Sequence, residues 1–228
     1  MSFFSFAWNW LNSASQWQGA NGIPIRVGQH LYYTGLALLV AALIALPIGV
    51  LIGHYGRGGF IAVNLANVWR AIPTLGLLIL MVKLLGFSYL TWLIPLVVLA
   101  IPPILVNAFE GVASVDRDLK DAARGMGMTD QQILRKVEIP VALPLIMLGL
   151  RTAAIFVVAT ATIAAVIGFG VGGLGRYILD GLATNNYGEV AGGAALVVVL
   201  ALLVQFAFVG LRRLVVPAPL RDLARADS

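Results

Sequence analysis

The stretch LYYTGLALLVAALIALPIGVLI, residues 31–52, carries no charged side chain. A helix rises about 1.5 Å per residue, so a run of this length crosses a hydrocarbon core about 30 Å thick. Four further apolar stretches follow, at about residues 60–85, 90–109, 139–167 and 190–211. We therefore expect an all-α, polytopic membrane protein with five transmembrane helices.

The composition excludes several classes of protein. Hydrophobic residues make up 60% of the 228 residues and charged residues only 11%, whereas soluble domains carry about 25% charged residues. The net charge of +5 comes from basic residues scattered among the apolar spans, which form no stripe for a nucleic acid. There is no cysteine, so disulfides, thiolate catalysis and cysteine metal sites are excluded.

Basic residues near the span ends predict the orientation of the chain. They form three groups, after the first span, between the third and fourth, and after the fifth: Arg57; Arg117, Lys120, Arg124, Arg135 and Lys136; and Arg212, Arg213, Arg221 and Arg225. With five spans all three groups fall on one side, which the excess of positive charge marks as cytoplasmic. We expect the N-terminus outside the cell and the C-terminus in the cytoplasm.

The same pattern divides the chain into three parts. Residues 1–28 form an external or interfacial segment whose aromatic residues suit the membrane–water interface, and a frayed tail is the alternative. Residues 29–214 form the transmembrane domain, and residues 215–228 form a short polar tail in the cytoplasm. The aromatic residues of the first part are Phe3, Phe4, Phe6, Trp8, Trp10 and Trp17.

The polar loop between the third and fourth spans reads SVDRDLKDAARGMGMTDQQILRKVE, residues 114–138. Ser114 can cap a helix, and the acidic side chain of Asp116 suits the positive N-terminal end of that helix. Gly125 and Gly127 then end the helix. The loop is therefore expected to begin with one short helix that stops at a glycine turn.

A second helix is expected after this turn, because Thr129 and Gln132 match a capping box. On the flank of the first helix, Arg117 and Asp121 can pair at i, i+4. The first helix also carries an apolar stripe of mostly small side chains at i, i+3, i+4 and i+7: Leu119, Ala122, Ala123 and Met126. This stripe fits a cleft on a partner protein or, alternatively, the surface of the lipid headgroups.

The run DAARGMG, followed after nine residues by VEIP, resembles the EAA loop of ABC importer permeases. That loop reads Glu-Ala-Ala, three residues, Gly, nine residues and Ile-x-Leu-Pro, and the departures here are conservative, with Asp for Glu, Val for Ile and Ile for Leu. The resemblance implies the fold of a type I ABC importer permease and a loop that docks on a separate ATPase. The positions concerned are Asp121, Ala122, Ala123, Arg124, Gly127, Val137, Ile139 and Pro140.

Three longer segments are similar to the osmoprotectant permeases, which serve uptake of glycine betaine, choline and carnitine. They are RAIPTLGLLIL at residues 70–80, IPPILVNAFEGV at 101–112 and TATIAAVIGFGVGGLGRYILDG at 160–181. Permeases for methionine and other amino-acid-type solutes share the five-span architecture and remain the alternative.

The resemblance also implies partners and a location. We expect two ABC ATPase subunits, a second copy or a paralogue of this permease, an external solute-binding protein, membrane lipid, and a bacterial inner membrane. ATP and magnesium would bind the ATPase, while this chain would be a transport subunit with no enzyme activity, cofactor or metal of its own. The sequence contains no G-x-x-x-x-G-K-[ST] motif, so it has no P-loop.

A few charged and imidazole side chains lie in or beside the apolar spans. Arg70 and Arg151 lie inside spans, so they line the transport path or form structural pairs, and both readings stay open. Glu110 is taken as the only acidic residue near a span centre or edge, at the cytoplasmic end of the third span. His30 and His54 have no partners at ligand spacing and are expected to be interface residues rather than metal ligands.

Small residues fill the fourth span and predict close helix packing, within the subunit or across a two-fold axis. The run GFGVGG, residues 168–173, formally matches a dinucleotide fingerprint, but it follows a membrane span rather than a strand. We expect an external loop or re-entrant turn there. The small residues of the span are Ala153, Ala154, Ala159, Ala161, Ala164 and Ala165.

Two other classes of function are less consistent with the residues. An ATP-independent channel or secondary transporter would be expected to show an internal repeat or a carboxylate-lined span, and neither is visible. A membrane enzyme would need paired carboxylates, a histidine cluster or a Ser/His/Asp arrangement, and the sequence suggests none.

Overall fold

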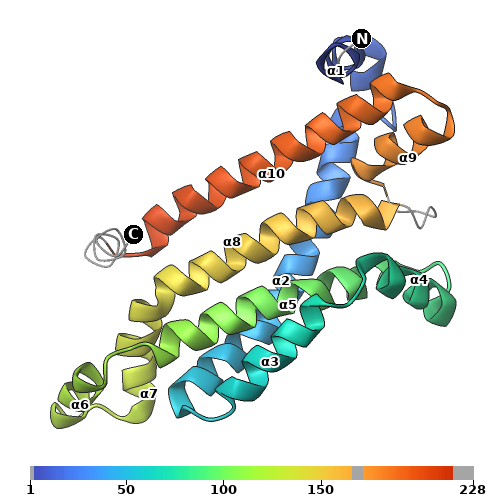
Figure 1. Cartoon of the computed structure of the whole chain (residues 1–228). Helices are drawn as coiled ribbons and strands as arrows, with labels where there is room; N and C mark the ends of the chain where they lie inside the picture. The colour runs from blue at the N-terminus through green and yellow to red at the C-terminus, as the bar shows by residue number, and fades with distance from the viewer. Residues whose placement is uncertain (1–2, 166–171, 218–228) are drawn as a thin grey trace. The chain divides into compact units, whose positions relative to one another are not determined.

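The computed structural model describes residues 3–165 and 172–217, apart from the side chain of Arg70. Over these residues the chain is helical and contains no strand (Figure 1). The elements are α1 (Phe3–Leu11), η1 (Ala14–Trp17), α2 (Ile23–Tyr55), α3 (Gly59–Arg70), α4 (Thr74–Leu85), α5 (Tyr89–Ala113), α6 (Arg117–Gly125), α7 (Asp130–Ile133), η2 (Leu134–Glu138), α8 (Ile139–Ala164), α9 (Gly175–Ala183) and α10 (Tyr187–Val215).

Among the described residues, four continuous helices are long and apolar enough to cross a membrane. They are α2, α5, the run Asp130–Ala164 that ends in α8, and α10. The prediction of five spans holds if α3 and α4 together form one more. The all-α fold class is confirmed, and α2 begins at Ile23, well before the start predicted for the first span.

The second predicted span, residues 60–85, is not one helix. It breaks between Arg70 and Thr74, where Pro73 holds an extended backbone with φ −65° and ψ 118°. Proline has no N–H to donate and disfavours a helical conformation in the residue before it, so a helix ends here. The second predicted span is therefore two helices, α3 and α4, joined at a sharp bend.

The chain forms two compact units. Unit 1 comprises Met1–Leu39, Ile72–Leu99 and Ala154–Val204, and unit 2 comprises Val40–Ala71, Ala100–Ala153 and Gln205–Ser228.

In unit 1 the N-terminal helix α1 is docked rather than frayed. Trp10 is buried and packs edge-on against Tyr177 of α9, with ring centroids 4.9 Å apart. The same core contains Ile23, Val158 and Leu174. The alternative of a frayed tail is therefore wrong for Phe3–Leu11, although several of its aromatic rings remain exposed.

His30 is a structural residue of unit 1. Its Nε2 lies 3.0 Å from the carbonyl oxygen of Val158, and its Nδ1 accepts the backbone N–H of Leu174 at 3.3 Å. The ring is buried and both of its nitrogens have partners. The imidazole therefore ties α2 to α8 and to the start of α9, which differs from the interface position expected from the sequence.

In unit 2, small residues let α2 and α5 approach closely. Ala45, Gly49 and Gly53 recur every four residues on one face of α2. A Cβ added at Gly49 would lie 2.6 Å from the carbonyl oxygen of Leu105, and one added at Gly53 would lie 2.7 Å from Cβ of Val112. Backbones in contact at this spacing are the usual device of helices packed in lipid.

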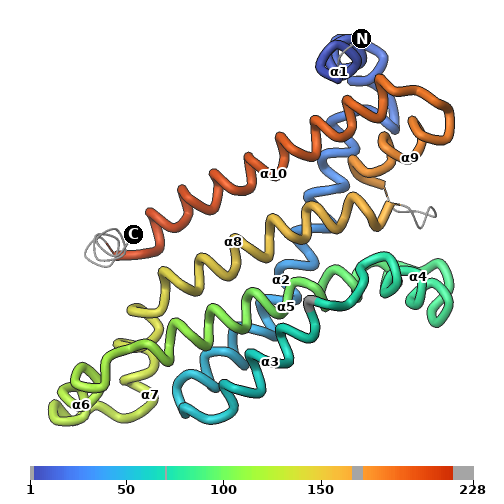
Figure 2. Tube along the Cα trace, in the orientation of Figure 1, coloured from blue at the N-terminus to red at the C-terminus, as the bar shows by residue number. Residues whose placement is uncertain are grey.

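Helix α8 packs against α5 in unit 2 by the same means. A Cβ added at Gly149 would lie 2.8 Å from the carbonyl oxygen of Pro103, and one added at Gly111 would lie 3.1 Å from Cβ of Ala142. Figure 2 follows the chain out of α5, through α6 and α7, and back into α8. The loop that the sequence singled out is thus carried by two closely packed helices.

Most of the small residues predicted to pack in the fourth span are buried inside this chain. Ala159 is exposed, so close packing across a two-fold axis stays open for it alone. The buried ones are Ala153, Ala154, Ala161, Ala164 and Ala165.

Candidate functional site

Helix α6 begins at an aspartate cap. The carboxylate of Asp116 accepts the backbone N–H of Asp118 at 2.9 Å, which satisfies a donor at the positive end of the helix. The cap predicted at Ser114 is wrong, because its hydroxyl donates to the carbonyl oxygen of Gly111 at 3.1 Å. Ser114 is thereby tied back to the last turn of α5 and is not available to α6.

Helix α6 ends in a Schellman motif. Gly127 has a φ of +82°, its N–H donates to the carbonyl of Arg124 at 2.9 Å, and the N–H of Met128 donates to the carbonyl of Ala123 at 3.2 Å. These two bonds satisfy carbonyls that the helix end would leave free. Only glycine adopts this left-handed conformation without strain, so the glycine at this position of the loop has a structural reason.

The capping box predicted after the turn is present. Thr129 accepts the N–H of Gln132 at 3.3 Å, and the Gln132 side chain accepts the N–H of Thr129 at 2.9 Å. The expectation of a second short helix is wrong in one respect. The helix that this box starts is not separate, since Asp130–Ala164 runs without a break through α7, η2 and α8.

The junction of α7 and α8 is a π-turn that precedes Pro140. In η2 the backbone is wider than an α-helix, and the N–H of Ile139 donates to the carbonyl of Leu134, five residues back. The ring of a proline inside an α-helix clashes with the carbonyl four residues earlier, and a π-turn is one way to take up that clash. Pro140 therefore sits in a helix that widens to admit it.

The outer face of α6 presents the predicted apolar stripe. Met126 is 72% exposed, Leu119 and Ala122 are also exposed, and only Ala123 is buried. The expected pair of Arg117 with Asp121 is replaced by a pair in which Arg124 donates to Asp121 at 2.8 Å. Exposed pairs of this kind contribute little to stability, so a partner that contacts Asp121 could replace this pair at little cost.

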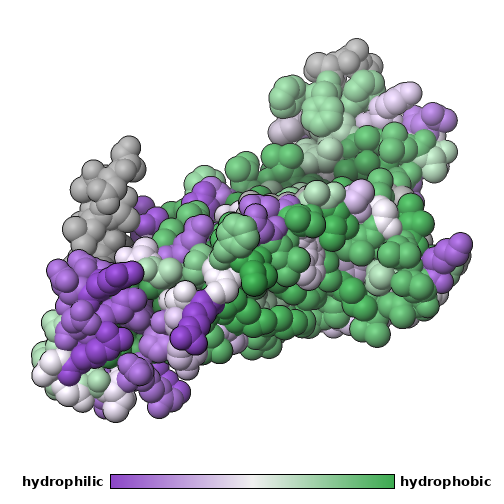
Figure 3. Space-filling view, turned by 60° about the horizontal axis from the view of Figure 1, so that its bottom comes forward, coloured by the Kyte–Doolittle hydropathy of each residue, from purple (hydrophilic) through white to green (hydrophobic). Residues whose placement is uncertain are grey.

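The hydrophilic residues of this region gather around α6. In Figure 3 they cluster at the left, where Figure 1 places α6 and α7, while hydrophobic residues cover the helices beside them. A polar surface hollow on α6 is lined by Arg117, Lys120, Asp121 and Arg124.

The inner face of α6 meets a buried carboxylate. Glu138, the last residue of η2, is 1% exposed. Its Oε1 lies 3.3 Å from Nζ of Lys120, and its Oε2 lies 2.5 Å from Nδ1 of His54 at the end of α2. All three belong to unit 2. This carboxylate thus joins α2, α6 and the start of α8.

Reasoning from the sequence missed this cluster. The statement that Glu110 is the only acidic residue near a span edge is wrong, because Glu110 is exposed and Glu138 is buried. One signal was available. Glu138 stands between Val137 and Ile139, and a carboxylate in apolar surroundings needs a charged or hydrogen-bonded partner.

The two arginines of the predicted spans have different outcomes. Nε of Arg151 on α8 donates to Oε1 of Gln205 on α10 at 2.7 Å, so Arg151 pairs with a side chain of another helix, and both readings of its role stay open. The side chain of Arg70 lies outside the described residues. Of the run at residues 168–173, the first four residues also lie outside them. The described residues contain no group of three or more His, Asp or Glu that could hold a metal.

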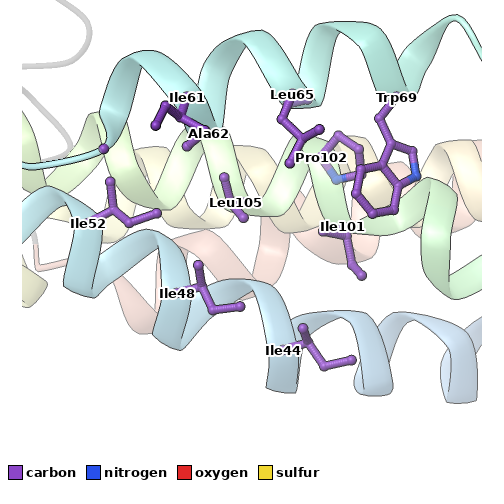
Figure 4. Close-up of a pocket in the computed structure, with 12 residues that line it drawn as sticks. Ile44, Ile48, Ile52, Ile61, Ala62, Leu65, Trp69, Ile101, Pro102 and Leu105 are labelled. Carbon is purple, nitrogen blue, oxygen red and sulfur yellow. The ribbon is translucent and has the colours of Figure 1, made fainter.

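An apolar groove of about 420 Å³ lies between α2, α3 and α5 in unit 2 (Figure 4). Among the described side chains that line it, none is charged and one, Trp69, is aromatic. The residues labelled in Figure 4 are Ile44, Ile48, Ile52, Ile61, Ala62, Leu65, Trp69, Ile101, Pro102 and Leu105.

Comparison with known proteins finds relatives that are similar to this chain over most of its length. The carnitine transport permease protein OpuCB of Listeria monocytogenes is 35% identical over 205 residues, which cover 90% of this chain and 93% of that protein. The glycine betaine/carnitine/choline transport system permease protein OpuCB of Bacillus subtilis (strain 168) is 33% identical, covering 87% of this chain and 90% of that protein.

A solved structure shares the fold. It is described as inward facing conformations of the MetNI methionine ABC transporter, CY5 native crystal form. It covers 84% of this chain and 95% of its own, with a TM-score of 0.70 and 28% identity. The fold expected for an ABC importer permease is confirmed.

Residues 45–220 match the family described as the binding-protein-dependent transport system inner membrane component. The match spans α6, the glycine turn, the π-turn and Pro140. The chain belongs to this family and is the inner-membrane permease component of an ABC importer.

Proposed function

We propose that this permease carries osmoprotectants of the quaternary-amine class, such as glycine betaine, choline or carnitine. The observation that carries the proposal is similarity over most of the chain to permeases named for these solutes, at 35% and 33% identity. The structural neighbour named for methionine is 28% identical, and transport of methionine or another amino acid remains the second candidate.

The exposed face of α6 supports docking on an ATPase. We propose that Asp121, Ala122, Ala123, Arg124 and Gly127 form the docking loop, with Pro140 closing the motif. The stripe of Leu119, Ala122 and Met126 is exposed and presents apolar side chains to a cleft. The sequence has no P-loop of its own, so ATP and magnesium would bind the partner.

The full assembly would contain two permeases, two ATPases and an external binding protein. The described residues of one permease provide four or five candidate spans, which enclose little volume, so a second copy or a paralogue would complete the path. ATP binding would bring the ATPases together and move both docking loops. That motion would switch the path between outward and inward access.

The orientation in the membrane is also a proposal. The basic residues of α6 and of the end of α10 would lie in the cytoplasm, and the N-terminus would lie outside. This arrangement requires α3 and α4 to count as one span. Labelling of single cysteines in the cysteine-free chain would test it, with Ser5 expected to react from outside and Gln131 from inside.

Docking is tested by Asp121→Arg and by Gly127→Trp. The first reverses the charge on the exposed face, and the second adds a large side chain at a backbone with positive φ. Both are expected to reduce co-purification of the ATPase and solute uptake. Gln131→Arg is the control, because it also introduces an arginine, on exposed α7 in the spacer of the motif. Unchanged co-purification and uptake in both variants would contradict docking.

The substrate is tested in proteoliposomes that contain the permease, its ATPase and its binding protein. Radiolabelled glycine betaine, choline, carnitine and methionine are offered separately. Uptake of a quaternary amine, competed by the other two and not by methionine, is expected. Uptake of methionine alone would overturn the proposed substrate class.

A further inference from the structure

We propose that Glu138 is a positioning residue that fixes α6 to the ends of α2 and α8, so that these three segments move as one body when the ATPase moves α6. The proposal rests on the proposed docking of an ATPase at α6. It assigns a role to a residue that occupies the variable position of the Ile-x-Leu-Pro pattern.

Helix α6 is held to the rest of unit 2 along one side. Lys120 is half-buried and Ala123 is buried, while the other seven of the nine residues of α6 are exposed. Ala123 carries only a methyl group. The contact of Lys120 with Glu138 therefore supplies a polar link that holds the inner face of this helix to the rest of unit 2.

The carboxylate of Glu138 is held at both of its oxygens. Each oxygen of Glu138 has its own partner, Nζ of Lys120 at 3.3 Å for one and Nδ1 of His54 at 2.5 Å for the other. The side chains of these partners are only 16% and 10% exposed. Water is thus largely excluded from the contact. If either partner moved away, a buried charge would be left without a partner.

Removing one partner of a buried ion pair is strongly destabilising, because the remaining charge is left uncompensated. Because breaking this buried contact is costly, it stays intact while the ATPase moves α6. A surface pair such as Arg124 with Asp121 would give way instead.

The carboxylate of Glu138 connects α6 to the ends of α2 and α8. His54 lies on α2 one residue after Gly53, where α2 touches α5, and Glu138 is the last residue of the π-turn that leads into α8. A displacement of α6 therefore reaches two membrane-spanning helices through one side chain. Local π-turns often occur at functional sites, which agrees with this placement.

The test measures coupling rather than stability alone. Glu138→Gln, Glu138→Asp and the wild type are reconstituted with the ATPase and binding protein, and solute uptake is divided by ATP hydrolysed. Glu138→Gln is expected to keep the ATPase bound and to lower uptake per ATP roughly tenfold, the size expected for one charged hydrogen bond. Glu138→Asp, which keeps the charge, is expected to recover part of the loss.

A covalent bridge separates coupling from folding. Because the chain has no cysteine, Lys120→Cys with Glu138→Cys can be joined by a short bifunctional thiosulfonate and released by reductant. The bridged protein is expected to regain uptake per ATP, and the reduced protein to lose it. The same protein is compared with itself, so a difference in folding cannot explain the change.

The outcomes are distinct. Wild-type uptake per ATP in Glu138→Gln, loss of ATPase binding in that variant, or a bridge that blocks uptake would each overturn the inference. If Asp121→Arg releases the ATPase while Glu138→Gln stays fully coupled, the proposed function stands and the inference falls. If the wild-type permease binds no ATPase, the proposed function itself fails.

Discussion

Lys120 and Glu138 lie 3.3 Å apart, measured from Nζ to Oε1, although the turn at Gly127 separates them in the chain. The contact folds α6 back onto the start of the next membrane-spanning helix. It leaves Leu119 and Met126, which flank the buried Ala123, exposed. Part of this short helix is thus fixed to the permease, and the rest is available to a partner.

The turn that makes this possible depends on the backbone of Gly127. Its φ is +82°, yet a Cβ added there would meet no atom within 4 Å. Gly127→Ala is therefore expected to cost only backbone strain, about 1–2 kcal/mol. The melting temperature of the purified permease would fall by a few degrees.

Gly127→Asn is the matched variant, because asparagine tolerates the left-handed conformation better than alanine does. Its melting temperature is expected to lie between those of the wild type and Gly127→Ala. Equal melting temperatures for all three proteins would show that the turn carries no strain.

The second partner of the buried carboxylate can be removed without touching α6. His54→Phe keeps a ring of similar size but removes the nitrogen that lies 2.5 Å from Glu138. Loss of a hydrogen bond to a charged group costs about 1.5–3 kcal/mol, so a clear drop in thermal stability is expected. Tyr55→Phe is the control, since that side chain is 69% exposed, and an equal drop there would contradict the assignment.

The contact of α2 with α5 predicts a contrast between two glycines on one helix. A Cβ at Gly53 would lie 2.7 Å from Cβ of Val112 and 2.8 Å from the carbonyl oxygen of Phe109, whereas one at Gly35 would meet nothing within 4 Å. Gly53→Ala is expected to destabilise the permease by about 1–3 kcal/mol. Gly35→Ala removes a helical glycine at no steric cost and is expected to stabilise by about 0.4–1 kcal/mol.

Urea or thermal unfolding of the two variants in the same detergent gives the comparison. Because both changes add one methyl group to α2, any general effect of alanine on the helix cancels. A loss of stability in Gly35→Ala equal to that in Gly53→Ala would exclude close packing at Gly53.

Local signals predicted the parts of the loop that depend on neighbours in sequence. The capping box at Thr129 and the glycine stop at Gly127 each need only a few consecutive residues, and both appear as expected. The cap at Ser114 failed because Asp116 also fits a cap position, and only the end of α5 decides between them. Two adjacent candidates cannot be ranked without that tertiary constraint.

Long-range contacts were beyond the reach of sequence patterns. His54 and Glu138 are separated by 84 residues, and the contact exists because glycines bring α2 onto α5. Proline likewise has two outcomes here. Pro73 breaks a predicted span, while Pro140 lies in a helix widened by a π-turn, and the sequence around each does not distinguish them.

The pair formed by Arg151 and Gln205 gives a final prediction about charge within the membrane. Nε of Arg151 donates to Oε1 of Gln205 at 2.7 Å, so Gln205→Leu would leave that donor without its acceptor at a partly buried position. A loss of about 1.5–3 kcal/mol in unfolding free energy is expected. Leu203→Met is the control, because that side chain is exposed and makes no such contact.

If the pair is structural, adding Arg151→Met to Gln205→Leu costs little more, since both changes remove the same bond. A double variant that loses uptake completely while keeping the stability of Gln205→Leu would instead place Arg151 in the transport path.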